Sequence, residues 1–435
     1  MLPPDHQPPP VPSFGEALRF WIKLGWISFG GPAGQIAIMH KELVERRRWL
    51  GEEHFLHALN FCMLLPGPEA QQLATYLGWR LHGARGGIAA GVLFVLPSVF
   101  ILWGLSWLYM AGGGIGWVQG IFHGLMPAVI AIVFSAVKRI GGKALKSPAL
   151  WGLALLSFVA IHFFQVSFVV IILAAGLLGY LGGTRWPRQF PAGKGHGKAD
   201  GDELPVVELP PPIPASGART LRICALCLTL WWLPVLLCGL LLGWGSVPFQ
   251  EGLFFSKAAL VTVGGAYAVL PYVNQMAVGH YGWLGERQMM AGLGLAETTP
   301  GPLIMVLQFV GFVAAWQHPG GLPPLLAATL GAAITTWVTF LPCFLFVFLG
   351  GPHVEGLCEK RSLASALTAI TAAVVGVILN LAVDFSVHAL WPPGGFDGFV
   401  LVMAVGALVA MERFKVGVMP VLGVCGLAGV VWGMV

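Results

Sequence analysis

The sequence predicts an all-α polytopic membrane protein built from two inverted-topology repeats whose helices are broken at Pro and Gly. Hydrophobic residues make up 57% of the 435 residues and charged residues only 10%, whereas soluble domains carry about 25% charged residues. Uncharged runs recur at 88–111, 322–351 and 416–435, each close to the roughly 20 residues that cross a bilayer. A third observation, an internal repeat, divides the chain in two.

The internal repeat appears when the chain is shifted along itself by 234 positions. The coinciding motifs are Gly-Gly at 30–31 and 264–265, Trp-Leu-Gly-Glu at 49–52 and 283–286, and Pro-Gly-Pro at 66–68 and 300–302. The same shift carries Lys23 onto Lys257, and both lysines stand in apolar segments. A charge that recurs by symmetry inside a membrane indicates a binding site, so the pair points towards anion transport.

The elements follow one another in five parts. These are a Pro-rich N-terminal tail (1–13), a first membrane repeat (14–180), a cytoplasmic linker (181–221), a connecting transmembrane helix (222–245) and a second, inverted membrane repeat (246–435). The tail lacks the charged-then-apolar pattern of a cleaved signal peptide. The linker is rich in Pro, Gly and charge, a composition that does not form a packed core.

The distribution of loop charge predicts that the two repeats face opposite ways. Lysine and arginine cluster at 41–48, 80–85 and 138–146 in the first repeat, and the equivalent loops of the second repeat are nearly free of them. The second repeat carries its basic residues instead at 360–361 and 413–415. Because basic loops stay on the cytoplasmic side, we expect the connecting helix to turn the second repeat over. The N-terminus and linker are then cytoplasmic and the C-terminus periplasmic, in a bacterial inner membrane.

The number of spans is open between two alternatives. Six full spans in each repeat plus the connecting helix give thirteen, and this count puts the arginines at 46–48 outside. Alternatively, 14–37 and 55–79 each enter and leave by one side, bending at their Gly-Gly-Pro and Pro-Gly-Pro motifs, and the arginines stay inside. We favour the second, because Pro and Gly free backbone groups that are tolerated at depth only where protein or a water-filled cavity satisfies them.

The Pro-Gly-Pro motifs are the first candidates for chemistry. A proline that opens a helix leaves the first N–H groups free, and these point back towards the break. Such helix N-termini bind oxyanions, so the two breaks, with Lys23 and Lys257 nearby, predict an oxyanion site. The alternative is that each motif only kinks a packed helix and that the lysines reach towards the membrane interface. Repetition in register favours the functional interpretation.

Two carboxylates are candidates for proton coupling. Glu69 follows the first Pro-Gly-Pro and Glu297 precedes the second. The 234-residue shift matches them to Leu303 and Met63, so they are not symmetry mates. A carboxylate buried in a membrane can carry a proton. The competing interpretation makes Glu69 an ordinary first-turn residue that the helix dipole stabilises.

Several motifs together resemble the chromate ion transporter family in its long, two-half form. They are SFGGPAGQIAIMHKELVERRRWL, LPGPEAQQLATYLGW, GGIAAGVLFVLPS, VGGAYAVLPYV and TPGPL. The resemblance covers nearly the whole chain. It implies efflux of chromate across the inner membrane by two halves of opposite orientation, with sulfate as a competing isostere.

The resemblance also gives weight to particular residues of the first repeat. They are Gly30, Gly31, Pro32, Arg46, Pro66, Gly67, Pro68, Glu69 and, more weakly, Gln71 and Arg80. Pro300, Gly301 and Pro302 repeat the Pro-Gly-Pro motif. The second repeat departs from the pattern, because Ala266 replaces the proline of Gly-Gly-Pro and Leu303 replaces the glutamate of Pro-Gly-Pro-Glu. Equal function of the two halves is therefore not implied.

The sequence also argues against other functional classes. No G-x-S-x-G, no H-E-x-x-H and no clustered His/Cys spacing occurs, so we expect neither an enzyme nor a metal or other cofactor. The net charge of +5 lies mostly in a few loops, which is typical of membrane topology and not of nucleic-acid binding. Carriers of sulfate or another oxyanion, and a passive anion channel, share these features and stay open as alternatives. The partners expected are a small oxyanion and the lipid bilayer, and a homodimer is an assembly that the sequence allows.

Overall fold

The computed structural model describes residues 11–191, 216–353 and 361–434, and every regular element within them is helical. Six of these helices are long and apolar enough to cross a bilayer. The prediction of an all-α polytopic membrane protein is therefore confirmed. Most of the expected tail (1–13), part of the expected linker (181–221) and Lys360 lie outside the described residues.

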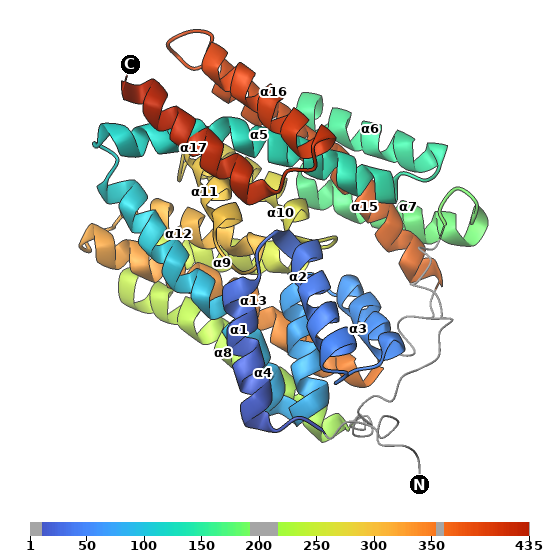
Figure 1. Ribbon diagram of the computed structural model, residues 1–435. Coiled ribbons are helices and arrows are strands. Elements are labelled where there is room, and N and C mark those ends of the chain that lie inside the picture. The colour runs from blue at the N-terminus through green and yellow to red at the C-terminus, as the bar shows by residue number, and fades with distance from the viewer. Residues whose placement is uncertain (1–10, 192–215, 354–360, 435) are drawn as a thin grey trace.

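The first half of the chain forms eight helical segments (Figure 1). They are α1 (Phe14–Ile27), α2 (Gly31–His40), η2 (Lys41–Arg46), α3 (Glu52–Leu64), α4 (Glu69–Ala111), α5 (Gly116–Ala144), α6 (Pro148–Phe164) and α7 (Phe168–Arg185). The connecting helix is α8 (Gly217–Leu242). It begins before the expected residue 222, and the Arg219 guanidinium lies 5.6 Å from the centre of the Trp79 ring.

The second half repeats this order. Its segments are α9 (Val247–Val261), α10 (Ala266–Asn274), η3 (Gln275–His280), α11 (Glu286–Thr298), η4 (Leu303–Met305), α12 (Val306–Gln317), α13 (Pro324–Gly350), η5 (Gly351–His353), α15 (Arg361–Leu390), α16 (Gly398–Arg413) and α17 (Val418–Met434). Helix α4 consists of two helices joined at a kink, because His82 and Gly83 leave the helical conformation. The loop between α12 and α13 stands at the matching place.

The repeat extends to local detail. The π-helical turns η2 and η3 are 234 residues apart, and each is followed by a tryptophan whose N–H donates back into the turn, from Trp49 to Leu43 O and from Trp283 to Ala277 O, both at 2.8 Å. Above Trp49 lies the guanidinium of Arg47, 4.9 Å from the ring centre. Above Trp283 the matching residue is Tyr281, stacked at 4.2 Å. The same position thus holds a cation in one half and an uncharged ring in the other.

The broken segments of the first half are hairpins. Arg47, just after η2, lies 3.7 Å from Glu16 in the first turn of α1, so α2 and η2 return to the side from which α1 started. His82, at the kink of α4, lies 2.8 Å from the carbonyl oxygen of Pro12, so the second hairpin opens on the same side. This geometry favours the re-entrant alternative, because the arginines at 46–48 then lie beside the start of α1.

Two faces of the molecule follow from these hairpins. After the kink, α4 crosses the molecule and α5 returns, with Tyr109 against Phe122 near their turn. Lys143, near the end of α5, therefore lies on the face of Arg47 and His82. Lys138 pairs with Glu412, which brings the end of α16 to this side too. We call this the basic face (Arg47, His82, Lys143 and Glu412), and the side of the α4–α5 turn the opposite face.

An outer group of helices packs on the hairpins. Helix α15 lies against α5, α6 and α7, and α16 and α17 lie against α5 (Figure 1). Gly120 and Gly124 on α5 meet Gly429 on α17 so closely that an added Cβ at either α5 position would meet the α17 backbone. Small residues allow this approach, which is a common way to pack membrane helices.

Candidate functional site

The Pro-Gly-Pro break of each half is joined to the other half by a hydrogen bond. The N–H of Gly67 donates to the carbonyl oxygen of Thr262 at 2.7 Å, and the N–H of Gly301 donates to that of Ser28 at 2.8 Å. Ser28 and Thr262 are themselves 234 residues apart and end the first helix of each half. The joint formed by these two bonds therefore has the pseudo-twofold symmetry of the repeat, and it pairs each helix break of one half with a break of the other half.

Glycine is required at both hydrogen bonds of the joint. Gly67 and Gly301 have φ of 121° and 116°, a left-handed region that other residues rarely adopt. A Cβ on Gly67 would stand 2.8 Å from the Cys343 sulfur, and one on Gly301 would overlap the Ser98 hydroxyl. The motif therefore does more than kink a helix, because its glycine lets the two halves come into close contact.

Buried amide and hydroxyl groups hold the joint. Gln35, which is fully buried, donates through Nε2 to the carbonyl oxygens of Ser28 at 3.2 Å and Gly301 at 2.5 Å. Gln72 donates to Pro66 O at 2.6 Å, and the Ser98 hydroxyl donates to Pro300 O. Sequence reasoning missed Gln35, although a glutamine within the apolar segment after Gly-Gly-Pro was a usable signal.

Both predicted coupling carboxylates lie beside this joint. Glu69, the first residue of α4, is half-buried, and Gly265 of the other half approaches it so closely that a Cβ there would stand 3.3 Å from its carboxylate. Glu297, near the end of α11, is buried and accepts a hydrogen bond from the Tyr267 hydroxyl. Glycine at 265 leaves room for the Glu69 carboxylate.

Two cations of α5 complete the arrangement. The Arg139 guanidinium lies 5.7 Å from the centre of the Tyr267 ring and interacts with Glu297, and Lys143 interacts electrostatically with Glu69. They are one turn apart and both are exposed. We call Glu69, Arg139, Lys143, Tyr267 and Glu297 the polar cluster. Exposed cations can attract an anion, and a buried carboxyl group can carry a proton.

Sequence reasoning placed Arg139 and Lys143 only in a basic loop. A lysine or arginine near the end of a span is typical of membrane topology, so nothing in the sequence marked these two. Their role in the polar cluster depends on the tertiary packing of α5 against α11 and on the contact of Arg139 with Tyr267 of α10.

The remaining predicted residues lie at three places. Gly30, Gly31 and Pro32 form the break between α1 and α2, where both glycines have positive φ. Lys23 and Lys257 are exposed on α1 and α9, about one turn before the breaks at Ser28 and Thr262. Gln71 is buried and donates to Thr75 at 3.2 Å.

Arg46 lies at the open end of the first hairpin, away from the joint. It pairs with Glu42 at 2.8 Å. Burial by itself raises the pKa of Glu42, but the Arg46 hydrogen bond and the charges of Lys23 and Arg46 outweigh it and hold that pKa below its ordinary value. The structure therefore gives Arg46 a bond that orders η2.

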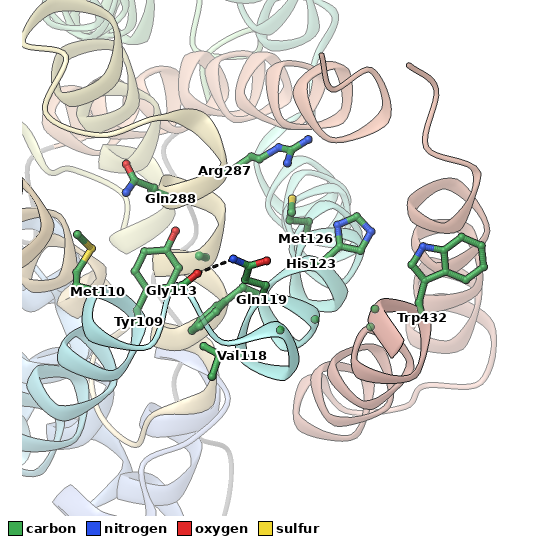
Figure 2. A pocket seen from close by; sticks show the side chains of 16 residues that line it. Tyr109, Met110, Gly113, Val118, Gln119, His123, Met126, Arg287, Gln288 and Trp432 are labelled. Atoms are coloured by element: carbon green, nitrogen blue, oxygen red, sulfur yellow. Dashed lines mark hydrogen bonds between the residues drawn. The ribbon is translucent and has the colours of Figure 1, made fainter. Parts of the chain in front are cut away.

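A separate cavity of about 780 Å³ opens on the opposite face (Figure 2). It is lined by the end of α4, the start of α5, the start of α11 and the end of α17, and its polar side chains include Tyr109, Gln119, His123, Arg287 and Gln288. Within the described residues, no group of three His, Cys, Asp or Glu could hold a metal ion.

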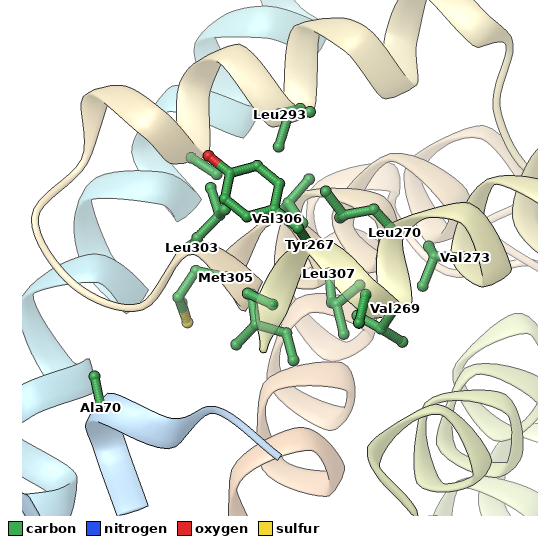
Figure 3. Packing of buried hydrophobic residues seen from close by; sticks show 14 of the residues in the cluster. Ala70, Tyr267, Val269, Leu270, Val273, Leu293, Leu303, Met305, Val306 and Leu307 are labelled. Atoms are coloured by element: carbon green, nitrogen blue, oxygen red, sulfur yellow. The ribbon is translucent and has the colours of Figure 1, made fainter. Parts of the chain in front are cut away.

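An apolar zone separates the cavity from the polar cluster. Along α5 the chain passes from Met126 at the cavity to Arg139 at the cluster, about 20 Å of helix. At the cavity end of this stretch, buried Leu125 and Val129 pack against Gly294 of α11. Figure 3 shows further packing nearby, where Leu293, Leu303, Val306 and Leu307 surround Tyr267. The two polar regions therefore do not join in this conformation.

Comparison with known proteins agrees with the repeat. The family described as chromate transporter matches residues 15–180 and 249–430. A chromate transport protein of Pseudomonas aeruginosa is 32% identical over 432 residues, which cover 97% of this chain and 93% of that protein. One of Cupriavidus metallidurans is 30% identical over 85% of this chain and 82% of its own length.

A shorter relative matches about a third of the chain. The uncharacterized transporter YwrB of Bacillus subtilis is 27% identical over 162 residues, which are 36% of this chain but 82% of that protein. The matched length is close to that of one repeat of the present chain and covers most of the shorter protein. No solved structure matches the chain.

Proposed function

The chain belongs to the chromate transporter family, and we propose that it is a secondary transporter that exports chromate, a tetrahedral dianion, across the inner membrane. Its relatives are transport proteins and not enzymes, and the same holds for this multi-pass membrane protein. The observation that carries the proposal is the pair of reciprocal hydrogen bonds that brings the helix breaks of both halves together beside the polar cluster. Transporters with internal repeats bind their substrates at such broken helices.

The two halves are inverted relative to each other in this proposal. Support comes from the hairpins, since those of the first half open on the basic face, while α11 of the second half starts at the cavity on the opposite face. The exchange of Arg47 for Tyr281 at matching positions follows the charge bias expected across a membrane. The basic face is then cytoplasmic, with the N-terminus inside and the C-terminus outside.

The polar cluster gives the substrate its entry. Arg139 and Lys143 are exposed on the basic face and attract a dianion from the cytoplasm. Lys23 and Lys257, about one turn from the breaks, lower the electrostatic cost of moving it past the joint. The apolar zone closes the path to the opposite face, which favours a carrier that alternates between two states over an open channel.

Either of two forces drives export. Moving a dianion out of an inside-negative cell releases about 4.6 kcal/mol per 100 mV, twice the roughly 2.3 for one charge. Protons carried by Glu69 or Glu297 supply the second route. If protons are coupled, Glu69→Gln flattens the pH dependence of flux, and an unchanged pH profile contradicts coupling through Glu69.

The experiment is uptake of labelled chromate into inverted membrane vesicles that contain the protein. We expect saturable uptake that sulfate inhibits, and a lower rate in the Lys23→Gln/Lys257→Gln variant. Flux that stays at the level of empty vesicles, with the protein shown to be folded by its thermal melt, contradicts chromate transport.

A further inference from the structure

The cavity on the opposite face is more than a packing gap. It holds about 780 Å³ and opens away from the polar cluster. In Figure 2, Arg287 and Gln288 approach it from the start of α11, while Gln119 and His123 approach it from the start of α5. One cation and several polar side chains therefore meet in one space.

Arg287 is an exception to the charge pattern of the molecule. The opposite face is otherwise poor in lysine and arginine, and the repeat mate of Arg287 in the first half is Glu53. Within the described part of the chain no ion pair includes Arg287. The carboxylate of Asp397, which directly precedes α16, lies 3.3 Å from the cavity residue His123. An arginine on this side works against the topology signal, and its exposed side chain lines the cavity, where an anion from solvent can reach it.

The neighbouring groups suit a tetrahedral oxyanion. The carbonyl oxygen of the Gln288 side chain accepts a hydrogen bond from the N–H of Gly285 at 2.9 Å, and its amide NH₂ faces the Tyr109 oxygen, which leaves the Tyr109 O–H as a donor. Gln119 already donates through Nε2 to Gly113 O at 2.5 Å, so it is not counted among the donors to the anion. The planar guanidinium of Arg287 can donate two parallel hydrogen bonds to such an anion.

The geometry points to a second oxyanion site in this cavity, at which the transported dianion pauses on the outer side of the apolar zone. This inference rests on the proposed function, and it adds a site that is distinct from the joint and from the polar cluster. The polar cluster admits the anion from the basic face, and the cavity site releases it at the opposite face. Because the same chemistry also fits a lipid phosphate, the experiment separates the two sources.

The test uses the Arg287→Gln variant in vesicles of both orientations. Right-side-out vesicles loaded with chromate expose the opposite face to labelled chromate, and inverted vesicles expose the basic face. We expect KM for exchange to rise about tenfold at the opposite face, because charge-assisted hydrogen bonds are lost. KM at the basic face stays within about twofold. Arg287→Lys keeps the charge but loses the planar guanidinium, so its KM at the opposite face lies between those of the wild type and Arg287→Gln. Arg413→Gln, at the basic face, changes neither KM value.

Calorimetric titration of the purified protein with sulfate gives a readout that does not need transport. The wild type binds at a site that Arg287→Gln removes, and this result upholds the cavity site even if no chromate flux is found. Unchanged sulfate binding in Arg287→Gln overturns the inference, as does an equal KM change on both faces. Loss of a co-purified phospholipid with no change in sulfate binding assigns the cavity to a lipid headgroup and also overturns it.

Discussion

Gly301 shows how a single residue of the joint sets the contact between the two halves. Gly301 combines a positive φ with a site where a Cβ would overlap the Ser98 hydroxyl. Ser98 in turn donates to Pro300 O, so the clash would also break a hydrogen bond. The glycine of each motif therefore fixes how closely the halves approach.

Gly301→Ala should destabilise the protein by roughly 1–3 kcal/mol, because the backbone is strained and the hydroxyl is displaced. The midpoint of thermal unfolding in detergent measures this. Gly142→Ala is the matched control, since a Cβ there meets nothing within 4 Å. Adding Ser98→Ala should recover part of the loss. A Gly301→Ala variant as stable as Gly142→Ala would show that the two halves are not closely packed at the joint.

Glu251 is a buried polar residue that sequence reasoning did not single out. It is 0% exposed on α9, and neither carboxylate oxygen has a hydrogen-bond partner. Gly331 of α13 lies against it, since a Cβ there would stand 2.8 Å from Oε2. Such a group costs stability, because it has left water and gained no partner.

Glu251→Met should therefore raise the thermal midpoint, with a gain of about 1–3 kcal/mol from removing an unsatisfied buried group of similar length. Glu251→Gln, which keeps a polar group in place, should gain less. A lower midpoint in Glu251→Met would mean that the carboxyl is satisfied in the membrane by a group such as water.

The candidate site was predictable only in part. Glu69 and Glu297 stood out because a carboxylate in an apolar stretch is unusual, and they do lie beside the joint. Arg139 and Tyr267 did not, because one resembled a loop cation and the other an ordinary core aromatic. Their meeting depends on the tertiary fold that brings Arg139 of α5 to Tyr267 of α10, and local sequence carries little information about such contacts.

Individual elements were easier to predict where backbone chemistry decides them. The breaks at Gly30 and Gly67 follow from glycine and proline, which end helices whatever surrounds them. The π-helical turns η2 and η3 and the kink at His82 were not predicted, since no residue type requires them. They were visible only as repeated positions once the structure was known.

The contact between α5 and α17 makes a prediction at this scale. A Cβ on Gly124 would overlap the carbonyl oxygen of Cys425, so Gly124→Val should force the helices apart. We expect a loss of roughly 1–3 kcal/mol, seen as a lower unfolding midpoint. Gly423→Val on α17, where a Cβ meets nothing within 4 Å, should have little effect. Equal midpoints for the two variants would contradict the packing.

The whole molecule is two copies of one unit that diverged at functional positions. Symmetry is kept at the joint, where Gly67 and Gly301 make equivalent bonds. It is lost where charge is involved, as at Glu69, whose mate is Leu303. One half is therefore not a substitute for the other, and a homodimer stays a prediction that light scattering of the purified protein can test.

Inversion of the halves predicts opposite locations for the termini. A protease-cleavable tag at the C-terminus should be cut in intact spheroplasts, and one at the N-terminus only after lysis, because an odd number of crossings separates them. Cleavage of both tags from the same side would contradict inversion.

The most direct measurement is chromate flux through the polar cluster. In inverted vesicles, Arg139→Gln/Lys143→Gln should lower the rate at sub-saturating chromate about tenfold or more, because the cations that attract the dianion are gone. Arg413→Gln, on the same face but outside the cluster, should leave the rate unchanged. A double variant that transports like the wild type, at equal amounts of folded protein, would contradict entry through the polar cluster.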